Sequence, residues 1–176
     1  MSEFEFTLTF TVPPRTAPDV DDLVERLGAA GCDDAVVGVG AWGRLALAFT
    51  REAPAASTAL TSALADVRAA EPAAELVEAA PDLVGLTDVA VLLGVTRQNV
   101  RKLMLACDSP VPAPLHEGRP SIWRLAKILV WLRDEKDYRI PELLLETAEA
   151  TRQANLAVEA RDADRAAQEL LAPLLA

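Results

Sequence analysis

The segment LTDVAVLLGVTRQNVRKLMLA, residues 86–106, constrains the fold of this chain more than any other. Small and apolar side chains recur at helical spacing on both sides of Gly94, at Val89, Ala90, Leu93, Val100 and Leu103. Thr87 and Thr96 are of a type that caps helix N-termini, and glycine adopts the positive φ of a tight turn. The segment therefore predicts two short helices, begun at Thr87 and Thr96, that cross closely at Ala90 around a buried Val95.

With those positions directed inward, polar side chains fall on the outer face at the start of the second helix: Thr96, Arg97, Gln98, Asn99, Arg101 and Lys102. Arginine pairs with guanine through two hydrogen bonds, glutamine and asparagine pair with adenine, and lysine binds phosphate. The first N–H groups of a helix also bind phosphate, here from the end that Thr96 caps. The pattern predicts that Arg97, Gln98 and Arg101 read base edges of double-stranded DNA and that Lys102 holds the backbone.

In these residues the chain resembles the helix-turn-helix family, and residues 83–134 look like its winged MerR/excisionase-like type. The resemblance implies a proline-rich link at 110–114, a wing at 115–123 around Gly118 and a closing helix at 125–133. It implies DNA contacts at the backbone or minor groove from the wing and its end, by Arg119, Arg124 and His116, with Trp123 and Trp131 packed behind. A bacterial transcription regulator is the function it implies. Because no cysteine follows at a plausible metal-sensing position, a metal-sensing role is not supported.

The charge of the chain is unevenly distributed. The formal net charge is −10, but residues 1–85 carry −9, residues 86–139 carry +3 and residues 140–176 carry −4. Screening at physiological salt acts over roughly 8 Å, so a local cationic face can bind an anion although distant acidic surfaces oppose it. The partition favours an anionic partner for the middle segment, and solvated surface charge is the simpler alternative.

The first 80 residues predict an α+β module. Phe4, Phe6, Leu8 and Phe10 alternate with polar residues, which is typical of a strand with one buried face. A helix at 20–27, two strands around 41–43, a helix at 60–67 and a strand at 74–78 follow. The order β-α-β-β-α-β predicts a ferredoxin-like sandwich over residues 1–80. A boundary near Pro81 separates it from residues 81–138, and the acidic module is a candidate for a regulatory or protein partner.

Residues 139–176 contain nothing that breaks a helix between Pro141 and about Ala172. Such a helix would be roughly 48 Å long, so it calls for a partner or a break. A seam with 4-3-4-3-4 spacing runs along it, at Leu156, Ala160, Ala163, Ala167, Leu170 and Leu174. Small seam residues let helices approach closely, so the segment is a candidate for homodimerisation. The alternatives are a helix folded back on the α+β module and a frayed tail.

Several other features predict no active or cofactor site. One histidine, His116, and two distant cysteines, Cys32 and Cys107, do not assemble a zinc site or a base, nucleophile and orienting group, so we expect no enzyme, metal or cofactor. Gly38, Gly40 and Gly43 spell GxGxxG, but a strand follows them, which indicates a hairpin. Asp33 and Asp34 are interpreted as turn residues. No apolar run is long enough to span a membrane, and we expect a cytoplasmic protein.

Two functional alternatives remain open at this point. One is an accessory factor of a mobile element that bends DNA, as excisionase-like proteins do. The other is a ligand-sensing or protein-interaction module in which the two crossed helices serve packing alone and their charges face water.

Overall fold

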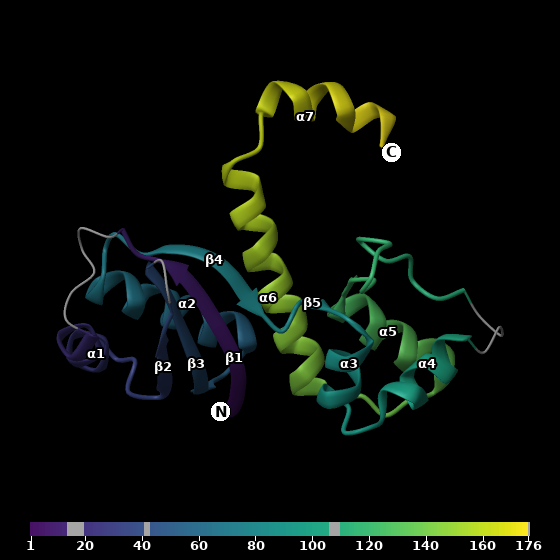
Figure 1. Ribbon diagram of the computed structural model, residues 1–176, viewed down its shortest axis with the longest axis horizontal. Helices are drawn as coiled ribbons and strands as arrows, with labels where there is room; N and C mark the ends of the chain where they lie inside the picture. The colour runs from purple at the N-terminus through teal and green to yellow at the C-terminus, as the bar shows by residue number, and fades with distance from the viewer. Residues whose placement is uncertain (14–19, 41–42, 106–109, 176) are drawn as a thin grey trace.

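The computed structural model describes residues 1–13, 20–40, 43–105 and 110–175 (Figure 1). Its first unit has the elements β1 (Ser2–Thr11), α1 (Val20–Ala29), β2 (Ala35–Val39), β3 (Arg44–Ala53), α2 (Ala56–Ala70) and β4 (Glu75–Ala80). The four strands form an antiparallel sheet in the order β2-β3-β1-β4. The predicted α+β class is confirmed, and the elements follow one another in the predicted order.

Alternation along β1 and β3 decides which face of the sheet is covered. Phe4, Phe6, Leu8 and Phe10 of β1 are buried, whereas Glu3 and Glu5 are exposed on the opposite face. Helices α1 and α2 bury the apolar face, because their own inward residues, among them Leu27 and Val67, join the same core cluster. The other face of the sheet carries the alternate residues of the strands, which include Glu3 and Glu5.

The second unit is mainly helical and has its own core. It consists of β5 (Leu83–Val84), α3 (Leu86–Leu92), α4 (Arg97–Leu105), β6 (Trp123–Arg124) and α5 (Leu125–Lys136). Strands β5 and β6 pair antiparallel. Ile128, Leu129 and Leu132 of α5 are fully buried against Val89 of α3 and Val100 of α4.

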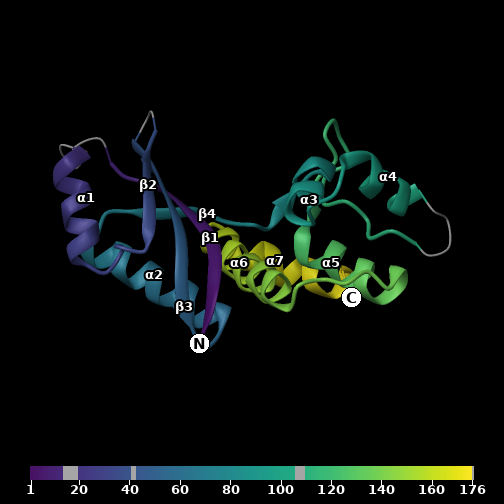
Figure 2. The same cartoon turned by 90° about the horizontal axis from the view of Figure 1, so that it is seen from below.

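Helix α6 (Glu142–Arg161) lies between the two units (Figures 1 and 2). Its buried row is mainly polar: Thr147, Thr151 and Asn155, with one alanine, Ala148. Thr151 Oγ1 donates to the carbonyl of Pro81 at 2.7 Å, and Glu146 Oε1 accepts the N–H of Ala56, at the start of α2, at 2.7 Å. The helix therefore joins the first unit and the linker between the two units, residues 81 and 82, through hydrogen bonds.

Of the two outcomes expected for a helix from Pro141 to about Ala172, a partner or a break, the structure shows a break. Helix α6 ends at Arg161, and α7 (Arg165–Leu171) follows, then a 3-10 turn, Ala172–Leu174. The break forms because Asp164 caps α7: its Oδ1 accepts the N–H groups of Ala166 and Ala167 at 2.9 and 3.4 Å. The predicted 4-3-4-3-4 seam crosses this break, so it does not form one continuous stripe.

Helix α3 also begins differently from the prediction. Gly85 occupies the N-cap position, and Asp88 Oδ2 accepts its N–H at 2.8 Å. Thr87, expected as the cap, lies within the first turn because the Asp88 carboxylate already satisfies the start of the helix. Among the helices that the structure describes, none is long and apolar enough to cross a lipid bilayer.

Candidate nucleic-acid interface

The turn between α3 and α4 is built around Gly94. Gly94 has φ +65°, and its neighbour Val95 donates its N–H to the carbonyl of Ala90 at 2.9 Å. A Cβ at Gly94 would meet nothing within 4 Å, so the backbone conformation alone favours glycine here. Ala90, Val89 and Val100 are buried where the two helices meet, as the sequence predicts.

Thr96 begins α4 as expected. Its hydroxyl oxygen accepts the N–H of Asn99 at 3.2 Å, which is the geometry of an N-cap. The carbonyl of Thr96 accepts the N–H of Val100, which is fully buried. Capping and the buried valine together fix which side of α4 faces outward.

The outward side carries every polar residue that the sequence assigned to it. Exposed side chains run along the first turns of α4, at Thr96, Arg97, Gln98, Asn99, Arg101 and Lys102. Thr96, Gln98, Asn99 and Lys102 line a shallow hollow with Val95. Within the described part of the chain, no carboxylate lies at ion-pair distance from Arg97, Arg101 or Lys102. Their charges are therefore available to an external anion.

A small β-turn structure, residues 115–122, follows α4 in the chain and precedes β6. The N–H of Ile122 donates to the carbonyl of His116 at 3.0 Å, and the N–H of Leu115 donates to the carbonyl of Ile122 at 2.8 Å. Arg119 at its tip is exposed. The exposed His116 imidazole lies over Gly118, where an added Cβ would be 2.2 Å from Nε2. Because the exposed imidazole can move aside, this contact does not by itself require glycine at position 118.

The two tryptophans of this region are both at least half-buried. Trp131 is buried, and Trp123 is half-buried with its Nε1 donating to the carbonyl of Pro112 at 3.0 Å. Trp123 fastens β6 to the proline-rich link, and Trp131 belongs to the core of the second unit.

Arg124 was assigned to DNA, and that assignment is wrong. Its side chain is 7% exposed and forms ion pairs with Asp82, which is fully buried, and with Glu159 Oε1 at 2.9 Å. Burial opposes its charge, but the hydrogen bonds to Glu159 and Asp82 outweigh burial, so the pKa of Arg124 lies above its ordinary value. The residue ties β6 to the linker and to α6 and is closed to an external phosphate.

The other sequence candidates, except Cys107, lie in the first unit. Asp34, interpreted as a turn residue, pairs with Arg51, which also binds Asp66 at 2.7 Å; no local pattern of residues indicates this buried arginine. Gly38 lies in β2, and the N–H of Gly40 donates to the carbonyl of Arg44 at 2.8 Å, so the glycines belong to the β2–β3 connection as expected. Cys32 is buried, and Cys107 lies outside the described residues.

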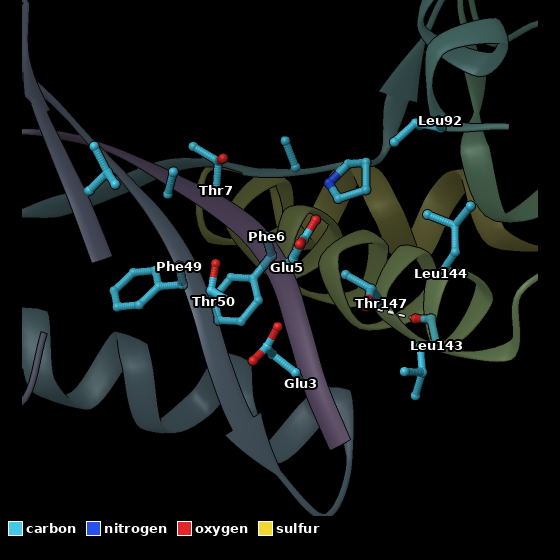
Figure 3. Close-up of a pocket in the computed structure, with 14 residues that line it drawn as sticks. Glu3, Glu5, Phe6, Thr7, Phe49, Thr50, Leu92, Leu143, Leu144 and Thr147 are labelled. Carbon is cyan, nitrogen blue, oxygen red and sulfur yellow. Dashed lines mark hydrogen bonds between the residues drawn. The ribbon is translucent and has the colours of Figure 1, made fainter. Parts of the chain in front are cut away.

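A cleft of about 650 Å³ separates the polar face of the sheet from the second unit (Figure 3). Glu3, Glu5 and Thr50 line its sheet side. Leu92 of α3 and Leu143 and Leu144 of α6 line the opposite side. The cleft therefore combines acidic and apolar groups where the two units face each other.

Comparison of the chain with protein-family models, with curated proteins and with solved structures finds no match in any of the three.

Proposed function

We propose that this chain is a sequence-specific double-stranded DNA-binding protein that acts as a transcription regulator. In this proposal residues 81–138 form a winged helix-turn-helix in which α4 is the recognition helix, and residues 1–80 form a ferredoxin-like module with a regulatory role. The mechanism is docking into a groove of DNA rather than bond chemistry.

The exposed cationic side of α4 is the observation that carries this proposal. Arg97, Arg101 and Lys102 face outward without a described carboxylate partner, whereas Arg51 and Arg124 each meet two carboxylates. A helix that serves packing alone gains nothing from keeping three like charges unpaired on one side. A groove lined with phosphate supplies the missing countercharge.

Each outward residue has a role that follows from its position. Arg97, Gln98 and Arg101 read base edges, and Asn99 is the amide beside them that matches adenine. Lys102 and the start of α4, capped by Thr96, hold phosphates on either side. Arg119 at the tip of the small turn reaches the backbone or the minor groove next to the bound major groove.

The position of the cleft supports the regulatory role of the first unit. Leu92 lies at the end of α3 and at the same time lines the cleft opposite Glu5. A ligand or segment held there would contact both the sheet and the helix that precedes α4. A shift in melting temperature on adding a metabolite, absent in Glu5→Gln, would support a ligand in this cleft.

Selection of bound sites from random duplexes at two salt concentrations tests the function. We expect a defined motif at both concentrations and an affinity that falls with salt by roughly −0.9 in logarithmic slope for each phosphate contacted. Recovery of no motif, or an affinity that does not change with salt, would reject the proposal.

A further inference from the structure

The segment that follows α6 has an unpartnered apolar side. Residues 165–175, here called the α7 segment, contain no buried residue. Leu170, Leu171, Leu174 and Leu175 are 75%, 50%, 78% and 80% exposed. Their spacing of i, i+1, i+4 and i+5 gathers them on one side of a helical segment. In Figure 1 the segment projects beyond α6, away from the helices and sheet of both units.

A groove of matching character lies on the first unit at the base of this segment. It has a volume of about 370 Å³ and is bordered by β4, α2 and the last turns of α6. Phe10, Leu64, Leu76 and Val158 supply its apolar surface, and Arg68 and Arg161 stand at its rim. Arg161 donates to the carbonyl of Leu76 at 2.8 Å, which holds one of these cations in place.

Charge also matches between the groove and the stretch formed by the α7 segment together with the turn before it, residues 162–164; within the α7 segment itself Glu169 and Arg165 cancel. Residues 162–175 carry three acidic side chains, Asp162, Asp164 and Glu169, against one basic side chain, Arg165. The rim of the groove carries only cations, Arg68 and Arg161. An apolar face preceded by a net acidic turn therefore meets an apolar floor with basic flanks.

We propose that the occupant of this groove is the α7 segment of a second copy of the chain, exchanged reciprocally. After the break at residues 162–164, no residue of α7 lines the groove of its own chain, although the groove adjoins the end of its own α6. In a twofold dimer each copy supplies one segment and one groove, so both apolar surfaces are covered at once. This inference goes beyond the proposed function and does not rest on it.

Sedimentation velocity of the full chain tests the exchange. We expect a concentration-dependent dimer. Leu171→Asp with Leu174→Asp removes two leucines that the dimer would bury at each site. The dissociation constant of the dimer should therefore rise about 100-fold or more. Ala157→Arg, which fills the groove from exposed helix surface, should do the same. Val91→Asp is the control for the leucine variant: it places an aspartate at another exposed apolar site and should leave the dimer intact. Circular dichroism verifies that each variant is folded.

Mixing the two defective chains separates exchange from closure within one chain. The leucine variant keeps its groove, and Ala157→Arg keeps its α7 segment, so the mixture should form a heterodimer with one intact site. Closure of the segment on its own groove predicts monomers in every sample. A monomeric parent chain at its highest soluble concentration, or a dimer that resists either change, overturns the proposal.

The charge match has its own test. Arg68→Glu should weaken the dimer, and Glu169→Arg in the same chain should restore it, with both effects reduced in high salt. If Glu169→Arg does not restore the dimer in the Arg68→Glu chain, the two residues do not pair and this groove is not the binding site.

Discussion

Asn155 of α6 binds both main-chain groups of Ala79, the last buried residue of β4. Its Oδ1 accepts the N–H of Ala79 at 2.7 Å, and its Nδ2 donates to the carbonyl of Ala79 at 2.8 Å. The same Nδ2 donates to Asp82 Oδ2 at 2.8 Å. One amide thus takes the place of a neighbouring strand at the edge of the sheet and at the same time holds the linker to the second unit.

Asn155→Ala tests this joint. The change leaves buried main-chain groups of Ala79 without partners, and we expect a loss of about 2–4 kcal/mol in the free energy of unfolding. Denaturant titration followed by circular dichroism measures it. Gln153→Ala, an exposed position on the same helix, is the control and should change stability little. Equal stability of both variants would contradict the role given to Asn155.

Arg124→Gln tests the buried ion pair. Asp82 would keep a fully buried charge without its partner, so we expect a loss of about 3–5 kcal/mol in unfolding free energy. Adding Asp82→Asn should recover part of that loss because it removes the uncompensated charge. The folded fraction of Arg124→Gln should keep the salt dependence of DNA binding of the parent chain. A lower salt slope would restore Arg124 as a phosphate contact.

Substitutions on α4 separate reading of bases from attraction to phosphate. Arg97→Ala and Arg101→Ala should each weaken binding to the selected site by about 1–3 kcal/mol and relax its sequence preference. Lys102→Ala should weaken binding to all sequences and lower the salt slope by about one. Fluorescence anisotropy measures both effects. Arg44→Ala, an exposed arginine of β3 in the other unit, should change neither.

Cys32 predicts a pH dependence of stability. Burial, and next the charge of Asp66, raise the pKa of its thiol from 9.0 to about 11. The folded state therefore keeps this proton in a range where the unfolded state has lost it. The contribution is fully present below pH 9 and falls by roughly 1.4 kcal/mol per pH unit between pH 9 and 11.

The control for this prediction is Cys32→Ala. Unfolding free energies of the parent chain and of the variant, measured from pH 8 to 11, should converge as the pH rises. Parallel curves would show that the thiol keeps an ordinary pKa in the folded protein.

Two glycines of positive φ should respond differently to alanine. At Gly94 nothing lies near an added Cβ, so Gly94→Ala meets only backbone strain and should cost about 1–2 kcal/mol. At Gly43 the Cβ would lie 2.2 Å from the carbonyl oxygen of Val12, the residue that follows β1. The loss in unfolding free energy should therefore be roughly 3 kcal/mol or more. Thermal unfolding compares them, and similar losses would contradict the steric argument.

Local patterns were enough to predict the elements of the first unit and the two crossed helices of the second. Strand β1 follows from alternation of Phe4, Phe6 and Leu8 with polar neighbours, and the start of α4 follows from Thr96 and the buried Val100. These features depend on residues within a few positions of one another. The sequence therefore also determined which side of α4 bears its cations.

Tertiary structure alone decided what Arg124 and α6 do. Arg119 and Arg124 have the same side chain five positions apart, yet Arg119 is exposed, while Arg124 meets Asp82 and Glu159, which lie 42 and 35 positions away. Helix α6 contributes a buried polar row because it packs against main-chain groups of the linker and of β4, which no periodicity of apolar residues reveals. Contacts between distant segments set the environment of a charge, and local spacing carries no information about them.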